Sequence, residues 1–176
     1  MFTRTALLRF FDGMEVERRT MLAELEGLPE TTRTTAPQRG AWTVAQVITH
    51  LAIAEEGSLA YLRKKHEGGR HKPAALSSRW KLMLLNLAIS LPIKYKAPTL
   101  VADVPATGYA EAKARWEAVR IAMRHTYGTL PEAHIGHELF KHPSLGRFSL
   151  MHGVRFMRRH VRRHHGQILR TMRALG

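Results

Sequence analysis

The clearest pattern of apolar positions lies between Phe148 and Leu175. Apolar residues recur there at steps of three, four or seven, at Leu150, Val154, Met157, Val161, Ile168, Met172 and Leu175. This spacing is typical of a helix that packs lengthwise against other helices. It predicts a long final helix, with Ser149 placed to cap its first turn.

Three earlier stretches have the same helical spacing of apolar residues, at about 3–26, 43–65 and 107–128. Glycine and proline follow the first and third of them and predict where these helices end. The second has the most complete start signal. Thr43 and Gln46 have the spacing of a capping box, in which each side chain satisfies a backbone N–H group of the other.

The stretches between these helices predict connections. Residues 31–40, 66–79, 94–106 and 129–147 are rich in glycine, proline and polar residues, and no convincing strand alternation is found. The most apolar run, 80–92, is too short for a bilayer, which needs about 20 apolar residues. Its basic flanks would permit attachment to a membrane surface, but we expect an inserted helix that covers the bundle end, a pocket or a partner subunit.

The pattern as a whole predicts an all-α fold: a four-helix bundle with a short additional apolar helix between the second and third main helices. At 176 residues the chain is expected to form a single domain, 1–176. It has no cysteine, which excludes disulfides, thiolate metal ligands and a cysteine nucleophile. The N-terminus resembles the start of a helix and not a signal peptide, so we expect a cytoplasmic protein without a transmembrane segment.

The chain is strongly basic, with a formal net charge of +14. The predicted final helix carries seven arginines, at 155, 158, 159, 162, 163, 170 and 173. Such a face suits phosphate, nucleic acid or an acidic small molecule, although a solvated helix exterior has the same composition. Because no nucleic-acid-reading motif is present, and because the apolar stripe places this helix in the core, nucleic acid is not the favoured partner.

Histidines interrupt two of the apolar stripes. His160 and His164 are one turn apart on the final helix, so their side chains point the same way. His165 is about 140° from His160 around a helix and does not join them. His50 lies on or beside the inner face of the second helix. Each signal alone also fits an ordinary polar or core histidine, but sites in helical bundles are built from facing helices, and His50 could meet the pair.

One stretch near each end of the chain resembles a sequence signature of a known family. In WTVAQVITHLAIAEE, Trp42 begins a helix and His50 follows eight residues later; HPSLGRFSLMHGVRFMRRHVRRHHGQI combines HP, a turn with LG, a capped helix and HxxxHxxQI. These resemble the opening and closing signatures of the DinB-like (DinB/YfiT-like) four-helix-bundle superfamily. The middle stretch KAPTLVADVPATGYAEAKARWE resembles the family's variable-helix region, so the likeness spans roughly residues 2–175.

The resemblance implies a divalent metal held by His50, His160 and His164, with zinc or nickel expected first and iron or manganese as alternatives. Gln167 stands in the place of the family's helix-stabilising glutamine. The apolar insertion at 80–93 and the high positive charge depart from the family pattern and leave the substrate open.

Members of this superfamily resemble thiol-dependent transferases and isomerases. The expected function is therefore a metal-dependent transferase, or a hydrolase-like small-molecule enzyme, that uses a low-molecular-weight thiol and forms a homodimer. Arg159 and Arg163 are the candidates for binding the anionic groups of such a thiol. The alternatives are a non-catalytic metal-binding bundle and a basic bundle that binds nucleic acid or another anionic partner. The HVRRH sequence lacks the glutamate of HExxH, which argues against metalloprotease chemistry.

Overall fold

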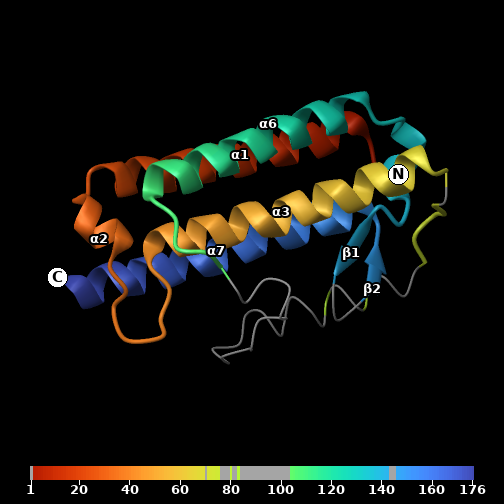
Figure 1. Cartoon of the computed structure of the whole chain (residues 1–176). Helices are drawn as coiled ribbons and strands as arrows, with labels where there is room; N and C mark the ends of the chain where they lie inside the picture. The colour runs from red at the N-terminus through yellow and green to blue at the C-terminus, as the bar shows by residue number, and fades with distance from the viewer. Residues whose placement is uncertain (1, 70, 76–79, 81–82, 84–103, 143–145) are drawn as a thin grey trace.

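The computed structural model describes residues 2–69, 71–75, 80, 83, 104–142 and 146–176. Within this part, four long helices run side by side: α1 (Arg4–Glu26), α3 (Val44–Glu67), α6 (Tyr109–Thr129) and α7 (Leu150–Leu175) (Figure 1). Helices α3 and α7 lie side by side, and both contact the pair formed by α1 and α6. The expectation of an all-α fold is confirmed.

The helix starts follow the capping residues found in the sequence. Thr43 and Gln46 form the complete capping box, because the Thr43 side chain accepts from Gln46 N and the Gln46 side chain accepts from Thr43 N. Ser149 caps α7 by accepting from His152 N. These caps fix where α3 and α7 begin, and so they fix which turn of each helix carries its histidines.

The core is built from the apolar stripes that the sequence predicts. Each long helix contributes residues that are fully or almost fully buried, among them Leu7, Phe11, Leu25, Val47, Leu51, Leu62, Tyr109, Trp116, Met123, Leu150, Val154 and Ile168. The burial of these side chains removes apolar surface from water, which is the main force that holds the helices together.

A buried ion-pair network crosses this core. Arg18, a charged residue in the apolar stripe of α1, pairs with Glu15 at 2.8 Å. Arg120 of α6 pairs with the same Glu15 at 2.8 Å and with Glu55 of α3 at 2.6 Å. Trp116 Nε1 donates to Glu55 at 2.8 Å. The network therefore pairs each buried charge with an opposite one and connects α1, α3 and α6, although Nη1 of Arg18 has no hydrogen-bond partner among the described residues.

Two of the expected connections contain secondary structure that the sequence did not indicate. The segment 31–40 was expected to be irregular, but it begins within the short helix α2 (Glu30–Thr34). The segment 129–147 contains the 3-10 helix η1 (Glu132–Gly136) and two short strands, β1 (Phe140–His142) and β2 (Gly146–Phe148). The strands pair antiparallel, with Phe140 opposite Phe148. The expectation of no strand was wrong, because strands of three residues are too short to show an alternating pattern.

The apolar run 80–92 lies outside the described residues, apart from Trp80 and Met83. Both of these are in helical conformation and both side chains are exposed, by 67% and 53%. Across the part of the chain that the structure describes, no helix combines the length and the apolar character needed to span a membrane.

Candidate metal centre

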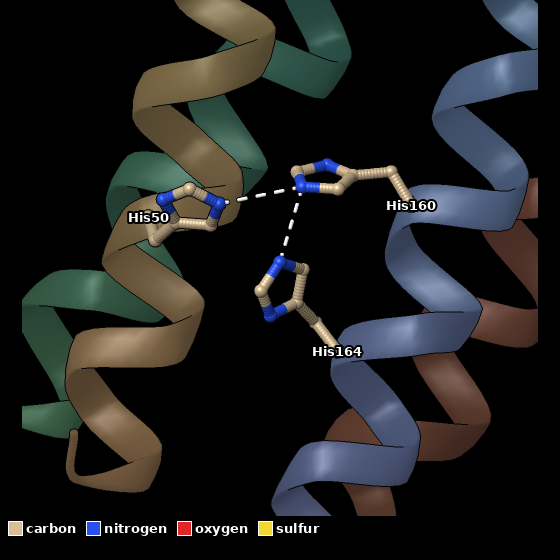
Figure 2. A group of neighbouring side chains, drawn as sticks. All are labelled: His50, His160 and His164. Carbon is tan, nitrogen blue, oxygen red and sulfur yellow. Dashed lines mark hydrogen bonds between the residues drawn. The ribbon is translucent and has the colours of Figure 1, made fainter. Parts of the chain in front are cut away.

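The three histidines singled out in the sequence meet at one point between α3 and α7. Figure 2 shows the ring of His50 approaching from α3 and the rings of His160 and His164 approaching from α7. His160 Nε2 lies 3.3 Å from His50 Nε2 and 3.1 Å from His164 Nε2. One ring nitrogen of each residue can therefore face the same small volume, which is the requirement for a shared metal ion.

The hydrogen bond made by Gln167 decides which nitrogen of His164 carries a proton. Oε1 of Gln167 lies 2.9 Å from Nδ1 of His164. A carbonyl oxygen only accepts, so Nδ1 must donate, and the neutral ring then presents an unprotonated Nε2 to His160. His160 Nε2 has one site for a proton or a lone pair, so only one of its two contacts can be a well-formed hydrogen bond. The arrangement is thus better suited to three nitrogen lone pairs around a cation.

Burial keeps His160 and His164 in the neutral form that binds metals. His50 is buried, while His160 and His164 are half-buried. Desolvation lowers the pKa of His164 to about 4, helped by the charge of His50 and opposed by the hydrogen bond of Gln167. Desolvation also holds the pKa of His160 well below its ordinary value, and the neighbouring His164 and His50 lower it further.

Aromatic rings line the three histidines. The ring of Trp42 lies 4.9 Å from that of His50 and is stacked with that of His164 at 6.5 Å. Phe156 stacks almost parallel to His160, with ring centroids 5.9 Å apart. These contacts limit how far the imidazoles can turn. In the sequence, Trp42 marked the start of a helix and of the opening family signature, but neither Trp42 nor Phe156 was selected as a site residue.

His142 is a fourth histidine near this group that the sequence reasoning did not select. It ends strand β1, and its ring packs edge-on against Phe156 at 5.0 Å. Its charge is among those that lower the pKa of His160, and burial lowers its own pKa. The HP dipeptide of the closing motif was the available signal, but only the pairing of β1 with β2 brings this residue to the site.

Two arginines of α7 are paired with an acidic residue of α1. Arg158 and Arg162 both bind Glu17 of α1, Arg158 through Nε at 3.0 Å and Arg162 through Nη2 at 2.6 Å. These hydrogen bonds, that of Arg158 first, lower the pKa of Glu17 to about 2. Part of the basic face therefore joins two helices of the bundle, and its charge is compensated within the chain.

The two arginines proposed as cofactor ligands differ in their positions. Arg163 is half-buried, and its charge lowers the pKa of both His160 and His164, so it lies near the triad. Arg159 is exposed and is not among the charges that shift those two pKa values. His165 points away from the triad, with Nε2 3.5 Å from Glu24 of α1, as the helical spacing predicted.

Comparison with known proteins identifies a family. The family model of the DinB superfamily matches residues 14–168, a range that contains the triad of His50, His160 and His164. No curated protein and no solved structure matches the chain. The match agrees with the resemblance found at the two ends of the sequence, and it extends across most of the chain.

Proposed function

The chain belongs to the DinB superfamily, and on that basis we propose that it binds one divalent transition-metal ion through His50, His160 and His164. The observation that carries this proposal is the spacing of the Nε2 atoms, 3.3 and 3.1 Å. Two nitrogens bound at 2.0–2.1 Å with tetrahedral angles lie about 3.3 Å apart. Two of the three nitrogen pairs thus have the required spacing already, and the third pair, from His50 and His164, lies within 4.8 Å. The Gln167 hydrogen bond supports the required tautomer of His164.

A metal ion held by His50, His160 and His164 would supply Lewis-acid chemistry, lowering the pKa of a thiol or water bound to it. Because the chain has no cysteine, a thiol nucleophile must come from a small molecule. We propose a low-molecular-weight thiol. Its proton is lost to solvent, its sulfur forms a bond to an electrophilic carbon of the substrate, and the leaving group departs with its bonding electrons. This reaction is a metal-dependent S-transfer.

The residues around the triad support a role in holding such a thiol. Trp42 and Phe156 supply apolar walls, and they bring no acid or base of their own. Arg163 supplies a positive charge close to His160 and His164, so it is the favoured residue for binding a carboxylate or phosphate of the thiol. Arg159, exposed on the same helix, is the weaker candidate.

Metal binding is tested by removing all metal with a chelator and titrating the protein with zinc or nickel. We expect one ion per chain to be lost in each of the variants His50→Ala, His160→Ala and His164→Ala. His165→Ala, one residue from a proposed ligand, is the matched control and is expected to bind normally. Full occupancy in His160→Ala would refute the proposed ligand set.

The thiol is tested separately on cobalt-substituted protein. Binding of a thiolate to cobalt gives a charge-transfer absorption that a water ligand does not give. Candidate low-molecular-weight thiols should produce this band in the wild-type protein, and Arg163→Gln should weaken the binding of anionic thiols more than that of neutral ones. If no thiol tested produces the band while the metal remains bound, S-transfer is excluded for those thiols and a hydrolase-like or non-catalytic metal site is favoured.

A further inference from the structure

A second group of histidines lies at the other end of α3. His66 is in the last turn of α3, His71 follows in the segment 71–75, and His134 and His137 belong to η1 and the residue that caps it. His50 and His66 lie on the same helix, separated along its axis by about 24 Å at 1.5 Å per residue. No single ion can contact both groups, so the second group must be explained by itself.

The rings of this group are closely packed. The centroids of His71 and His134 are 4.3 Å apart, and His66 lies 5.4 Å from His134. One ring nitrogen each from His66, His71 and His134 lies within 4.8 Å of the others. Tetrahedral binding would need about 3.3 Å, so each ring has to move by less than about 1 Å, which side-chain rotation allows.

Two ring nitrogens in the group have no hydrogen-bond partner among the described residues. Nδ1 of His66 and Nδ1 of His134 are both shielded from solvent and make no such bond. A buried polar atom without a partner costs about 1–3 kcal/mol, so a cluster of ordinary surface histidines would be expected to avoid it. A cation bound by these two nitrogens would remove the free-energy cost of leaving them without a partner.

His71 differs from His66 and His134, because one of its ring nitrogens already has a hydrogen-bond partner. Its Nδ1 lies 2.8 Å from Nδ1 of His137. With Nδ1 of His71 as the donor in this contact, Nε2 of His71 keeps its lone pair for a metal, in the way that a hydrogen bond from one imidazole nitrogen commonly orients the other toward an ion. His137 therefore positions His71 and need not be a ligand.

The backbone holds these segments together without any ion. Ala74 N donates to Gly136 O at 3.0 Å, and Glu138 N donates to Lys72 O at 2.9 Å. Gly69, with φ of 58°, allows the chain to turn directly after α3. The segment that carries His71 is thus fixed beside η1, so the ligands are largely preorganised.

A cavity of about 400 Å³ adjoins the group. Its lining residues are Tyr61, Gly69, His71, Lys72, Glu138 and Arg147. Because His71 is part of the lining, an ion bound beside it can be reached from solvent. Metal exchange at this position would not require the bundle to open.

We propose that His66, His71 and His134 form a second binding site for a divalent transition-metal ion, separate from the triad of His50, His160 and His164. Imidazole ligands suit zinc, nickel and copper better than magnesium or calcium, which prefer oxygen. The ion would join the end of α3 to the segment 71–75 and to η1. It would stabilise the folded chain, since a ligand that binds only the native state shifts unfolding in its favour.

Zinc stoichiometry is the test, measured by calorimetry and by metal analysis after removal of unbound metal. The wild-type chain is expected to bind two ions. His71→Ala/His134→Ala should bind one, and His50→Ala/His160→Ala should also retain one, at the second site. His125→Ala changes an exposed histidine of α6 and should still bind two.

A His71→Ala/His134→Ala protein that binds the same number of ions as the wild type overturns the second site. Loss of zinc only from the His50→Ala/His160→Ala protein would count against it in the same way.

A measurement on the unaltered chain covers the case in which a variant fails to fold. Zinc should protect His66, His71 and His134 from modification by diethyl pyrocarbonate, as mapped by mass spectrometry of peptides. His125 serves as the internal reference that zinc leaves reactive. Equal modification of the three residues with and without zinc contradicts the proposal, whatever happens at the triad.

Discussion

Gln167 accepts a hydrogen bond from His164, with 2.9 Å between Oε1 and Nδ1, one turn along α7. The family resemblance implied only a helix-stabilising role for this glutamine. Its contact gives it a more specific role, because it holds the imidazole with Nε2 toward His160. It acts on the proposed ion only through His164 and is therefore a positioning residue.

Replacing Gln167 should weaken metal binding without preventing it. For Gln167→Ala we expect metal affinity to fall by about 10- to 100-fold, since the orientation and basicity of His164 lose their support. Gln167→Glu keeps an acceptor at this place and should bind at least as tightly as wild type. Calorimetric titration of the three proteins decides the matter, and equal affinity for Gln167→Ala and wild type would mean that the hydrogen bond plays no part.

The metal-free chain should lose stability as the pH falls from about 6.5 to about 4. His164 has an ordinary pKa near 6.5 when unfolded and a pKa of about 4 when folded, because burial disfavours its charged form. Between these values the unfolded chain binds more protons, so unfolding becomes easier at lower pH. Above pH 6.5 this group should have no influence.

The size of this effect is at most about 3.5 kcal/mol, at 1.4 kcal/mol for each tenfold change in proton affinity. Denaturant unfolding at several pH values measures it. His164→Gln, which cannot be protonated there, should show a shallower fall in unfolding free energy over the same range. If the two proteins have parallel pH profiles, burial of His164 does not disfavour its charge.

The neighbours Glu55 and Glu56 should differ sharply in their effect on stability. Glu55 is buried and binds Arg120 and Trp116, whereas Glu56 binds Arg115 at an exposed position. Glu55→Gln removes one of the two carboxylates that the buried Arg120 binds, leaving it with Glu15, and should cost about 3 kcal/mol. Glu56→Gln should cost less than about 1 kcal/mol. Chemical denaturation gives both values, and similar losses would argue against the buried network.

Gly153 of α7 provides a test of how closely strand β1 packs against this helix. A methyl group there would lie 2.2–2.5 Å from ring and Cβ atoms of Phe140, so the strand would have to move. Gly153→Ala should destabilise the chain by at least about 1–3 kcal/mol. Gly166→Ala on the same helix meets only the end of Arg170 at 3.6 Å and should stabilise by up to about 1 kcal/mol. Thermal unfolding compares them, and equal melting temperatures would contradict the packing of β1 on α7.

The sequence predicts the long helices and the triad because both depend on helical periodicity. His160 and His164 are one turn apart on a helix with strong apolar spacing, and the capping box fixes the turn that carries His50. A local pattern was therefore enough to place all three residues on facing helices. No feature of the structure tests the expectations of a single domain, a homodimer and a cytoplasmic location, and they stay predictions.

Other features depend on contacts between segments that are distant in sequence. His71 and His134 come together only because short backbone hydrogen bonds join 71–75 to η1, and neither segment has a periodic pattern. The five-residue helix α2 was missed because it contains three threonines, which favour helix only weakly. Arg18 places a charge within the apolar stripe of α1, and only its contacts with Glu15 and Glu117 explain a charge in the core.

The coordination of the bound ion tests the central claim most directly. X-ray absorption spectroscopy of zinc-loaded His71→Ala/His134→Ala protein would report on the triad alone, because the second group is removed. The account predicts three imidazole nitrogens at 2.0–2.1 Å and at least one further light-atom ligand. It also predicts that His160→Ala, added to that variant, eliminates tight binding. A zinc ion with fewer than two imidazole ligands, or one that is bound unchanged without His160, would contradict it.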